Sequence, residues 1–262
     1  MTGAPLPCSL IAKLEQFTRL SSADRDALGA VTARRREVPA REDIAREGEE
    51  PGPDRLVLEG WACRYKQLED GRRQIIAIIL PGDLCPADAG VLRRMDHSIG
   101  ALTAVSLAEI EPDHLAEAGA RHARLAEALR WDARVAASIQ RAWTVNLGQR
   151  EASERLGHLI CELHARLRGV GLTQDGGFAM PLRQSDLGEA MGLTSVHINR
   201  SLQALRARGL IMLKERRLTV LDKDALRRAS LFDAGYLHLG RVGAHLDARE
   251  GNGAAGAAPR SA

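Results

Sequence analysis

Polar side chains between residues 194 and 203 are the groups in this chain best suited to recognition chemistry. Arg200 presents a planar guanidinium that can donate two hydrogen bonds to the O6 and N7 atoms of a guanine. Asn199 and Gln203 add donors and acceptors, while Val196 offers a methyl surface that suits a thymine methyl group. The predicted set is Thr194, Ser195, Val196, His197, Asn199, Arg200 and Gln203. Side chains of this kind on one helix predict contact with base edges and phosphates of double-stranded DNA.

These residues need a helix that presents them, and the flanking sequence predicts one. The apolar stripe of residues 184–191 predicts a short amphipathic helix, and Gly192 follows at a point where a sharp turn can require positive φ. Thr194 is then expected to cap the next helix, because its hydroxyl can accept from an otherwise unpaired backbone N–H. Helix, turn and helix in this order predict a helix-turn-helix motif.

The second helix has an apolar stripe and is followed by a ribbon. Ile198, Leu202, Leu205 and Leu210 recur at helical spacing and are expected to be buried, and Gly209 ends the helix. Residues 210–213 and 218–221 then predict two strands around a basic tip, which makes the motif winged. We assign four further residues to the DNA-binding surface: Arg183, Gln184, Lys214 and Arg216.

The charge distribution supports this assignment. Residues 181–230 contain ten Lys/Arg and five Asp/Glu, a net charge of +5, whereas the whole chain carries +3. A basic segment on a nearly neutral protein is expected where phosphate contacts supply affinity. An ordinary helical hairpin with solvated charges is the alternative that this distribution disfavours.

The chain resembles Crp/Fnr-family transcription regulators over about residues 10–239. Besides the winged helix-turn-helix, the matching pieces are residues 48–49, 56–60 (LVLEG), 80–84 (LPGDL) and 101–105 (ALTAV). The resemblance implies a cyclic-nucleotide-binding-type β-roll, a homodimer, two DNA half-sites and contact with RNA polymerase. It matches Arg200 to a guanine-reading arginine, whereas Val196 stands where better-known members have a cytosine-reading glutamate.

We therefore expect an α+β fold with an N-terminal β-roll, a long dimerisation helix and a C-terminal winged helix-turn-helix. The expected divisions are a sensor domain at 9–120, the central and connecting helices at 121–170, the DNA-binding domain at 171–240 and a disordered tail at 241–262. A chain of 262 residues is long enough for two domains that each bury a core. Aromatic residues make up only 3% of the sequence, so these cores must be built from aliphatic side chains.

The helix expected at residues 122–150 has one apolar face with small alanines. That face allows either a parallel dimer seam or packing on the chain's own β-roll, and the resemblance favours the seam. The seam residues are Leu125, Leu129, Ala136, Ile139 and Trp143.

The effector of the sensor domain is not specified by the sequence. In cyclic-AMP-binding relatives, a glutamate holds the ribose and an Arg-Ser pair holds the phosphate; the resemblance places Ala87 at the glutamate and Met95 and Asp96 at the pair. A carboxylate near a phosphate is repulsive, so we expect cyclic-AMP-type binding to be lost, unless a loop shift brings in Arg93 or Arg94. The candidate pocket comprises Gly82, Asp83, Arg93, Arg94, Asp96, His97 and Ser98.

Other chemistries have weaker support. The four cysteines are scattered without a CxxC pair, which indicates a reduced cytoplasmic protein. Cys85 is a candidate redox switch, with burial as a small apolar residue as the alternative. His97 is the one candidate haem ligand. We expect no metal, cofactor, catalytic residue or membrane segment. The alternatives left open are a cyclic-nucleotide-dependent regulator and a ligand-binding module that does not bind DNA.

Overall fold

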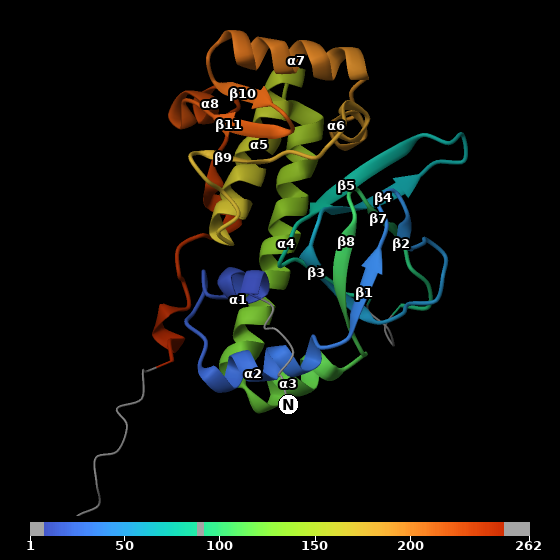
Figure 1. Cartoon of the computed structure of the whole chain (residues 1–262), viewed down its shortest axis with the longest axis vertical. Coiled ribbons are helices and arrows are strands. Elements are labelled where there is room, and N and C mark those ends of the chain that lie inside the picture. Colours follow the sequence, from blue (N-terminus) through green and yellow to red (C-terminus); the bar gives the residue numbers. More distant parts are fainter. Residues whose placement is uncertain (1–7, 88–91, 249–262) are drawn as a thin grey trace, which may run out of the picture.

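A computed structural model describes residues 8–87 and 92–248 of the chain. A strand-rich N-terminal half and a mainly helical C-terminal half are joined by one long helix, α4 (Ala123–Gln149), as Figure 1 shows. At about 1.5 Å per residue, a helix of this length spans roughly 40 Å. The α+β class and the order of β-roll, long helix and winged helix-turn-helix predicted from the sequence are confirmed.

Two four-stranded antiparallel sheets form the β-roll. Their apolar faces meet in a core that includes Val57 and Leu107 from one sheet and Ile79 and Ile99 from the other. One sheet has the order β1 (Arg35–Val38), β8 (Val105–Ile110), β3 (Asp54–Glu59) and β6 (Leu84–Cys85), and the other has the order β2 (Asp43–Ala45), β7 (Ser98–Ala101), β4 (Ala62–Gln67) and β5 (Arg73–Ile79).

Three short helices close the base of the molecule around one end of α4. They are α1 (Cys8–Leu14), α2 (Ser22–Val31) and α3 (His114–Arg121). Successive residues of a strand point to opposite faces, so Leu56 of β3 leaves the interior of the roll and packs on this helical layer with Leu10, Leu28 and Leu125. Figure 1 shows these base helices at one end of α4 and α7 at the other.

The C-terminal half contains α5 (Ala152–Gly169), α6 (Gln184–Met191), α7 (Ser195–Ala207) and α8 (Lys223–Ala229). Its sheet has the order β10 (Ile211–Lys214), β11 (Arg217–Val220) and β9 (Gly177–Ala179). The ribbon therefore has three strands where the sequence predicted two. The third strand is held by Phe178, which pairs with Leu218 and is fully buried.

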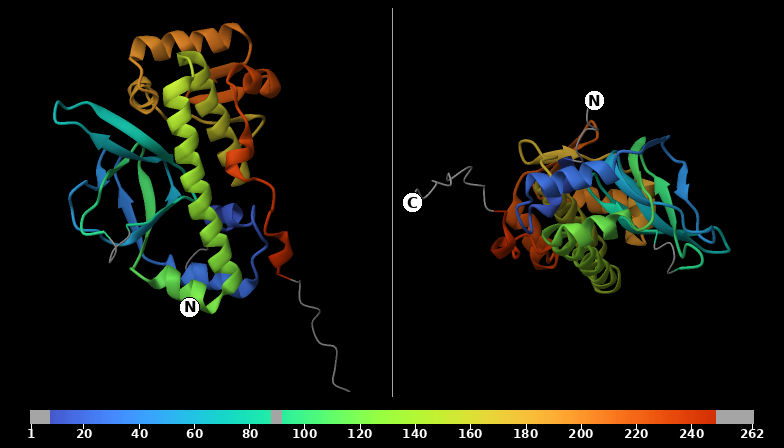
Figure 2. Two further views of the ribbon diagram at one scale, coloured as in Figure 1. Left: turned by 180° about the vertical axis from the view of Figure 1, so that it is seen from behind. Right: turned by 90° about the horizontal axis from the view of Figure 1, so that it is seen from below.

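One hydrophobic cluster runs through both halves of the molecule. Cys63 and Ile75 on the outer face of the β4–β5 sheet, with Trp61 just before β4, belong to the same cluster as Leu187 of α6 and Ile198 of α7. The two views in Figure 2 show the same proximity of the winged helix-turn-helix to this sheet. The recognition motif is thus packed against the roll.

The prediction of a disordered tail over 241–262 is wrong for residues 241–248. Arg241 and Gly243 donate backbone hydrogen bonds to the carbonyls of Gln16 and Phe17, at 2.9 and 3.1 Å. The segment follows η1 (Ala234–Leu237) and includes η2 (Ala244–Leu246). The Asp247 carboxylate also accepts from Arg19 N at 2.8 Å. Composition gave no sign of this order, because these contacts join the segment to residues more than 220 positions away. Residues 249–262, with most of the low-complexity sequence, lie outside the described residues.

No helix in the described ranges combines the length and apolar character that a membrane crossing requires.

Candidate nucleic-acid interface

The turn between α6 and α7 has the geometry predicted from the sequence. Gly192 ends α6 in the left-handed conformation, with φ +63°. Leu193 N donates to the carbonyl of Gly188 at 3.0 Å, which closes the turn. The Thr194 hydroxyl accepts from the backbone N–H of His197 at 3.4 Å, so the expected N-cap of α7 is confirmed.

The two faces of α7 differ as the apolar stripe predicted. Ile198, Leu202 and Leu205 are buried against the core, whereas Val196 is 67% exposed. All eleven residues assigned to the DNA-binding surface are exposed: Thr194, Ser195, Val196, His197, Asn199, Arg200, Gln203, Arg183, Gln184, Lys214 and Arg216. Exposure of polar side chains near a helix N-terminus is what base reading requires.

Six of these residues line one shallow groove of about 390 Å³ between α6 and α7: Gln184, Ser195, Val196, Asn199, Arg200 and Gln203. Arg200 has no carboxylate within ion-pair distance in the ranges that the structure describes, and neither has Arg183. Both guanidinium groups are therefore available to an anionic partner.

The wing adds cations beside this groove. Glu215 and Arg216 have φ values of +50° and +58°, so a two-residue turn joins β10 to β11. Such turns favour Asn and Gly, because side chains rarely adopt positive φ. The Arg216 carbonyl accepts from Met180 N at 2.7 Å, which anchors the turn to the chain before α6. The tip thus carries charged side chains at positions where Asn or Gly would have less backbone strain.

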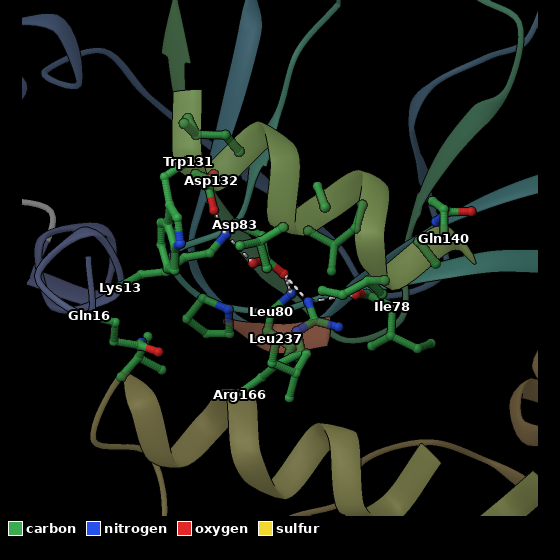
Figure 3. A pocket seen from close by; sticks show the side chains of 18 of the residues that line it. Lys13, Gln16, Ile78, Leu80, Asp83, Trp131, Asp132, Gln140, Arg166 and Leu237 are labelled. Atoms are coloured by element: carbon green, nitrogen blue, oxygen red, sulfur yellow. Dashed lines mark hydrogen bonds and ion pairs between the residues drawn. The ribbon is translucent and has the colours of Figure 1, made fainter. Parts of the chain in front are cut away.

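Asp83, assigned to an effector pocket, instead belongs to a buried ion cluster beside a cavity of about 80 Å³. Its carboxylate lies 2.8 Å from Lys13 Nζ and 2.5 Å from Arg166 Nη2, and it accepts from Leu80 N at 2.8 Å (Figure 3). Burial alone would raise the pKa of Asp83, but the two cations lower it to about 2. The carboxylate is fully used in joining α1, the β5–β6 turn and α5.

The other predicted pocket residues are not brought to this cavity. Gly82, with φ +92°, packs on Ser9 so closely that a Cβ would lie 2.7 Å from its carbonyl oxygen. Arg93, Arg94 and Asp96 are exposed, and the His97 Nδ1 lies 2.5 Å from the Asp96 carboxylate. The Ser98 hydroxyl accepts from a backbone N–H of the neighbouring turn.

Two apolar residues fill positions where the resemblance placed polar ligand groups. Ala87 and Met95 are 1% and 4% exposed and belong to the core of the roll. The Asp96 side chain next to Met95 is 75% exposed and turns to solvent. Within the described residues, this region therefore offers packing where the resemblance places a phosphate cradle.

The predicted dimer seam needs correction. Leu125 and Trp143 are buried within their own chain, Leu125 among the base helices and Trp143 in the core shared with α5. Leu129 and Ile139 are half-buried, and Ala136 is exposed. Helical periodicity identifies an apolar face but not the surface that covers it. One face of α4 packs against other elements of the same chain, and another face stays exposed.

The cysteines are dispersed, as their spacing indicated. Cys63, Cys85 and Cys161 are buried, and burial raises the pKa of Cys63 to about 11 and that of Cys161 to about 12. Burial also raises the pKa of Cys85, which disfavours the reactive thiolate that a redox switch needs. Among residues 8–87 and 92–248, no three His, Cys, Asp or Glu side chains are grouped as a metal site.

A winged helix-turn-helix with an open, basic recognition face, carried on a β-roll, defines a DNA-binding transcription regulator. Family models agree: residues 35–122 match the cyclic nucleotide-binding domain and residues 154–229 match the Crp-like helix-turn-helix domain. The nitrogen fixation regulation protein FixK of Azorhizobium caulinodans is 30% identical, over 86% of this chain and 94% of its own. The chain belongs to the Crp/Fnr family of transcription regulators.

Solved structures show the same fold. FixK2 from Bradyrhizobium japonicum superposes with a TM-score of 0.67 at 24% identity, covering 76% of this chain and 98% of its own. A CRP-family regulator from Thermus thermophilus gives a TM-score of 0.60 at 23% identity, with 75% and 97% covered.

Proposed function

We propose that the protein binds double-stranded DNA sequence-specifically through the outer face of α7, with Arg183, Gln184 and the wing contacting phosphates. The observation that carries this proposal is the groove beside Arg200, whose guanidinium is exposed and lacks an ion-pair partner among the described residues. Selection of bound duplexes from a random pool, using purified ligand-free protein, would identify the half-site. Affinity for that site should fall steeply with salt, because phosphate contacts release counterions. Absence of duplex binding at low ionic strength would favour a ligand module without DNA binding.

Within this surface, Arg200 reads a guanine and Val196 touches a thymine methyl. Replacing Arg200 by Ala should cost about 1–3 kcal/mol and relax preference at one base pair. Arg208→Ala is the matched control, because Arg208 is an exposed arginine at the opposite end of α7. Equal affinities of Arg200→Ala and wild type for the selected site would contradict the assignment.

The regulator acts as a homodimer through the open face of α4. Support comes from an apolar groove of about 440 Å³ between α3 and α4, lined by small residues such as Gly119, Ala126 and Ala133. Light scattering at micromolar concentration should give twice the chain mass. Ala133→Arg should give the single-chain mass, and Ala23→Arg, on the exposed face of α2, should not. A single-chain mass for the wild type would remove the dimer, and with it the expectation of a two-fold symmetric DNA site.

The β-roll has lost cyclic-AMP-type binding and senses a signal not yet identified, and the DNA-bound dimer contacts RNA polymerase. Buried Ala87 and Met95 and the outward Asp96 support the loss. The match of residues 35–122 to the cyclic nucleotide-binding domain favours the alternative, a cyclic-nucleotide-dependent regulator. Calorimetric titration with cyclic AMP and cyclic GMP separates the two: micromolar binding of either supports the alternative.

A further inference from the structure

Helix α6, the first helix of the helix-turn-helix, is held on the β-roll by an ion pair whose carboxylate is buried and whose arginine is partly exposed. Arg41 in the β1–β2 turn donates from Nη1 and Nη2 to the two carboxylate oxygens of Asp186, at 2.6 and 3.0 Å. The Asp186 side chain is 6% exposed. Two-pronged pairing of this kind fixes orientation as well as distance.

Arg41 has a backbone conformation that favours glycine. A contact of its side chain therefore has to compensate for the strain. Arg41 has φ +75°, a conformation that glycine adopts without cost and arginine does not. Its N–H donates to the Ala101 carbonyl at 2.8 Å, so the turn itself is made by the backbone. Strain of this kind persists where surrounding contacts compensate for it, and the contact that needs an arginine here is the one to Asp186.

Two further contacts hold the other end of α6. Gln74 Nε2 of β5 donates to the Ala190 carbonyl at 3.3 Å, and Arg73 Nε lies 3.5 Å from the Glu189 carboxylate. Arg73 is itself positioned by the Tyr65 ring, whose centroid is 3.7 Å from the guanidinium carbon. We call the five residues Arg41, Gln74, Arg73, Asp186 and Glu189 the latch.

The latch acts on the helix that supports the recognition helix. Asp186 also accepts from Arg183 N at 2.7 Å, capping α6, so its carboxylate joins the helix start to the roll. In Figure 1, α7 lies across the end of α4, with α6 between it and the roll. The exposed face of α7 remains open while the latch is closed, so the latch orients this face and does not cover it.

We propose that the closed latch holds α7 in the orientation that binds DNA. In a dimer joined along parallel α4 helices, two α7 helices placed as in Figure 1 lie at the same end of the assembly, as two half-sites on one duplex require. The inference rests on the proposed DNA binding.

The test compares latch variants of the full chain on the selected duplex. Arg41→Gly removes the side chain and the backbone strain together, so the roll keeps its fold. If most molecules then leave the competent orientation, apparent affinity should fall by about tenfold, since it scales with the competent fraction. The salt dependence should be unchanged, because no phosphate contact is lost. The control is Arg46→Ala, whose 69% exposed side chain forms an ion pair with Asp43 and touches no latch residue in the described part of the chain.

A double-mutant cycle separates the latch from the helix cap. Asp186→Asn keeps an oxygen for Arg183 N but loses the ion pair, so adding Arg41→Gly to it should weaken binding no further. Hydrogen exchange should speed up in α6 and β5 of both single variants and stay unchanged within α7. If folded Arg41→Gly binds DNA with wild-type affinity, the latch does not orient α7. If it binds more tightly, the closed latch is not the DNA-binding form. Failure of the wild type to bind any duplex would instead remove the proposed function.

Discussion

The indole Nε1 of Trp143 donates to both carboxylate oxygens of Glu162, at 3.2 and 3.1 Å, in the buried joint between α4 and α5. The same carboxylate accepts from Arg166 Nη1 at 3.1 Å and from the Tyr236 hydroxyl at 2.9 Å. Three parts of the chain, including the segment after α8, are thus tied to one fully buried acidic group.

Trp143→Phe should lower the free energy of unfolding by about 1–3 kcal/mol, because a buried carboxylate loses a donor. Trp131→Phe is the control: its indole N–H has no hydrogen-bond partner among residues 8–87 and 92–248, and its ring stacks on Phe17 with centroids 5.6 Å apart. Urea unfolding measures both. Equal losses in the two variants would show that ring volume, and not the hydrogen bond, sets the cost.

Thr194→Ala should destabilise α7 by about 1 kcal/mol through loss of its N-cap. Thr194→Ser keeps the hydroxyl and should behave as the wild type. Thermal unfolding reports the difference, and hydrogen exchange should locate it in the first turn of α7. A melting temperature unaffected by the alanine would mean that the hydroxyl bond at 3.4 Å contributes nothing.

His158 should make the fold less stable in mild acid. Burial and the nearby Arg150 lower the pKa of this imidazole to about 3, while in the unfolded chain it is about 6.5. The stability that the neutral His158 imidazole contributes is fully present above the unfolded pKa. It is lost as pH falls from about 6.5 towards 3, and the free energy of unfolding then drops by up to roughly 1.4 kcal/mol per pH unit. In His158→Leu this part of the pH dependence should disappear, whereas in His245→Asn, at an exposed histidine, it should persist. Urea unfolding midpoints measured between about pH 7 and 5 test this prediction. Parallel pH profiles of the wild type and His158→Leu would show that His158 does not cause the loss of stability.

Arg183→Ala should weaken DNA binding about equally on all sequences and reduce the salt slope by about 1, as expected for one lost phosphate contact. Arg72→Ala removes an arginine that is 77% exposed at the far tip of the β4–β5 hairpin and should leave the slope unchanged. Anisotropy titrations at several salt concentrations give both slopes. A loss confined to one base pair would make Arg183 a base-reading residue.

The recognition motif was predictable because its determinants are local. Gly192, Thr194 and the stripe from Ile198 to Leu205 specify the turn, the cap and the buried face within about a dozen residues. Each signal depends on backbone geometry or helical periodicity, which neighbouring residues determine. The strand β9 was missed, since three residues carry too little periodicity to be recognised.

Long-range contacts were not predictable in this way. The sequence drew attention to Asp83 through its Pro-Gly-Asp turn, but its partners Lys13 and Arg166 are 70 and 83 residues away. Arg41 and Asp186 are separated by 145 residues, and no local pattern indicates either partner. The assignment of Leu125 and Trp143 to a dimer seam failed for a related reason, because an apolar stripe does not name the surface that covers it.

The hydrophobic cluster shared by the β4–β5 sheet and the winged helix-turn-helix limits how this protein can be divided. A fragment starting at α5 would leave Trp61 and Ile75 behind and bare the side chains that pack on them. Chimeras that exchange recognition modules at the α4–α5 junction should therefore aggregate unless the outer face of the donor's sheet is transplanted too. Under the proposed function, substitutions on the solvent side of α7 can change the DNA preference without disturbing this cluster.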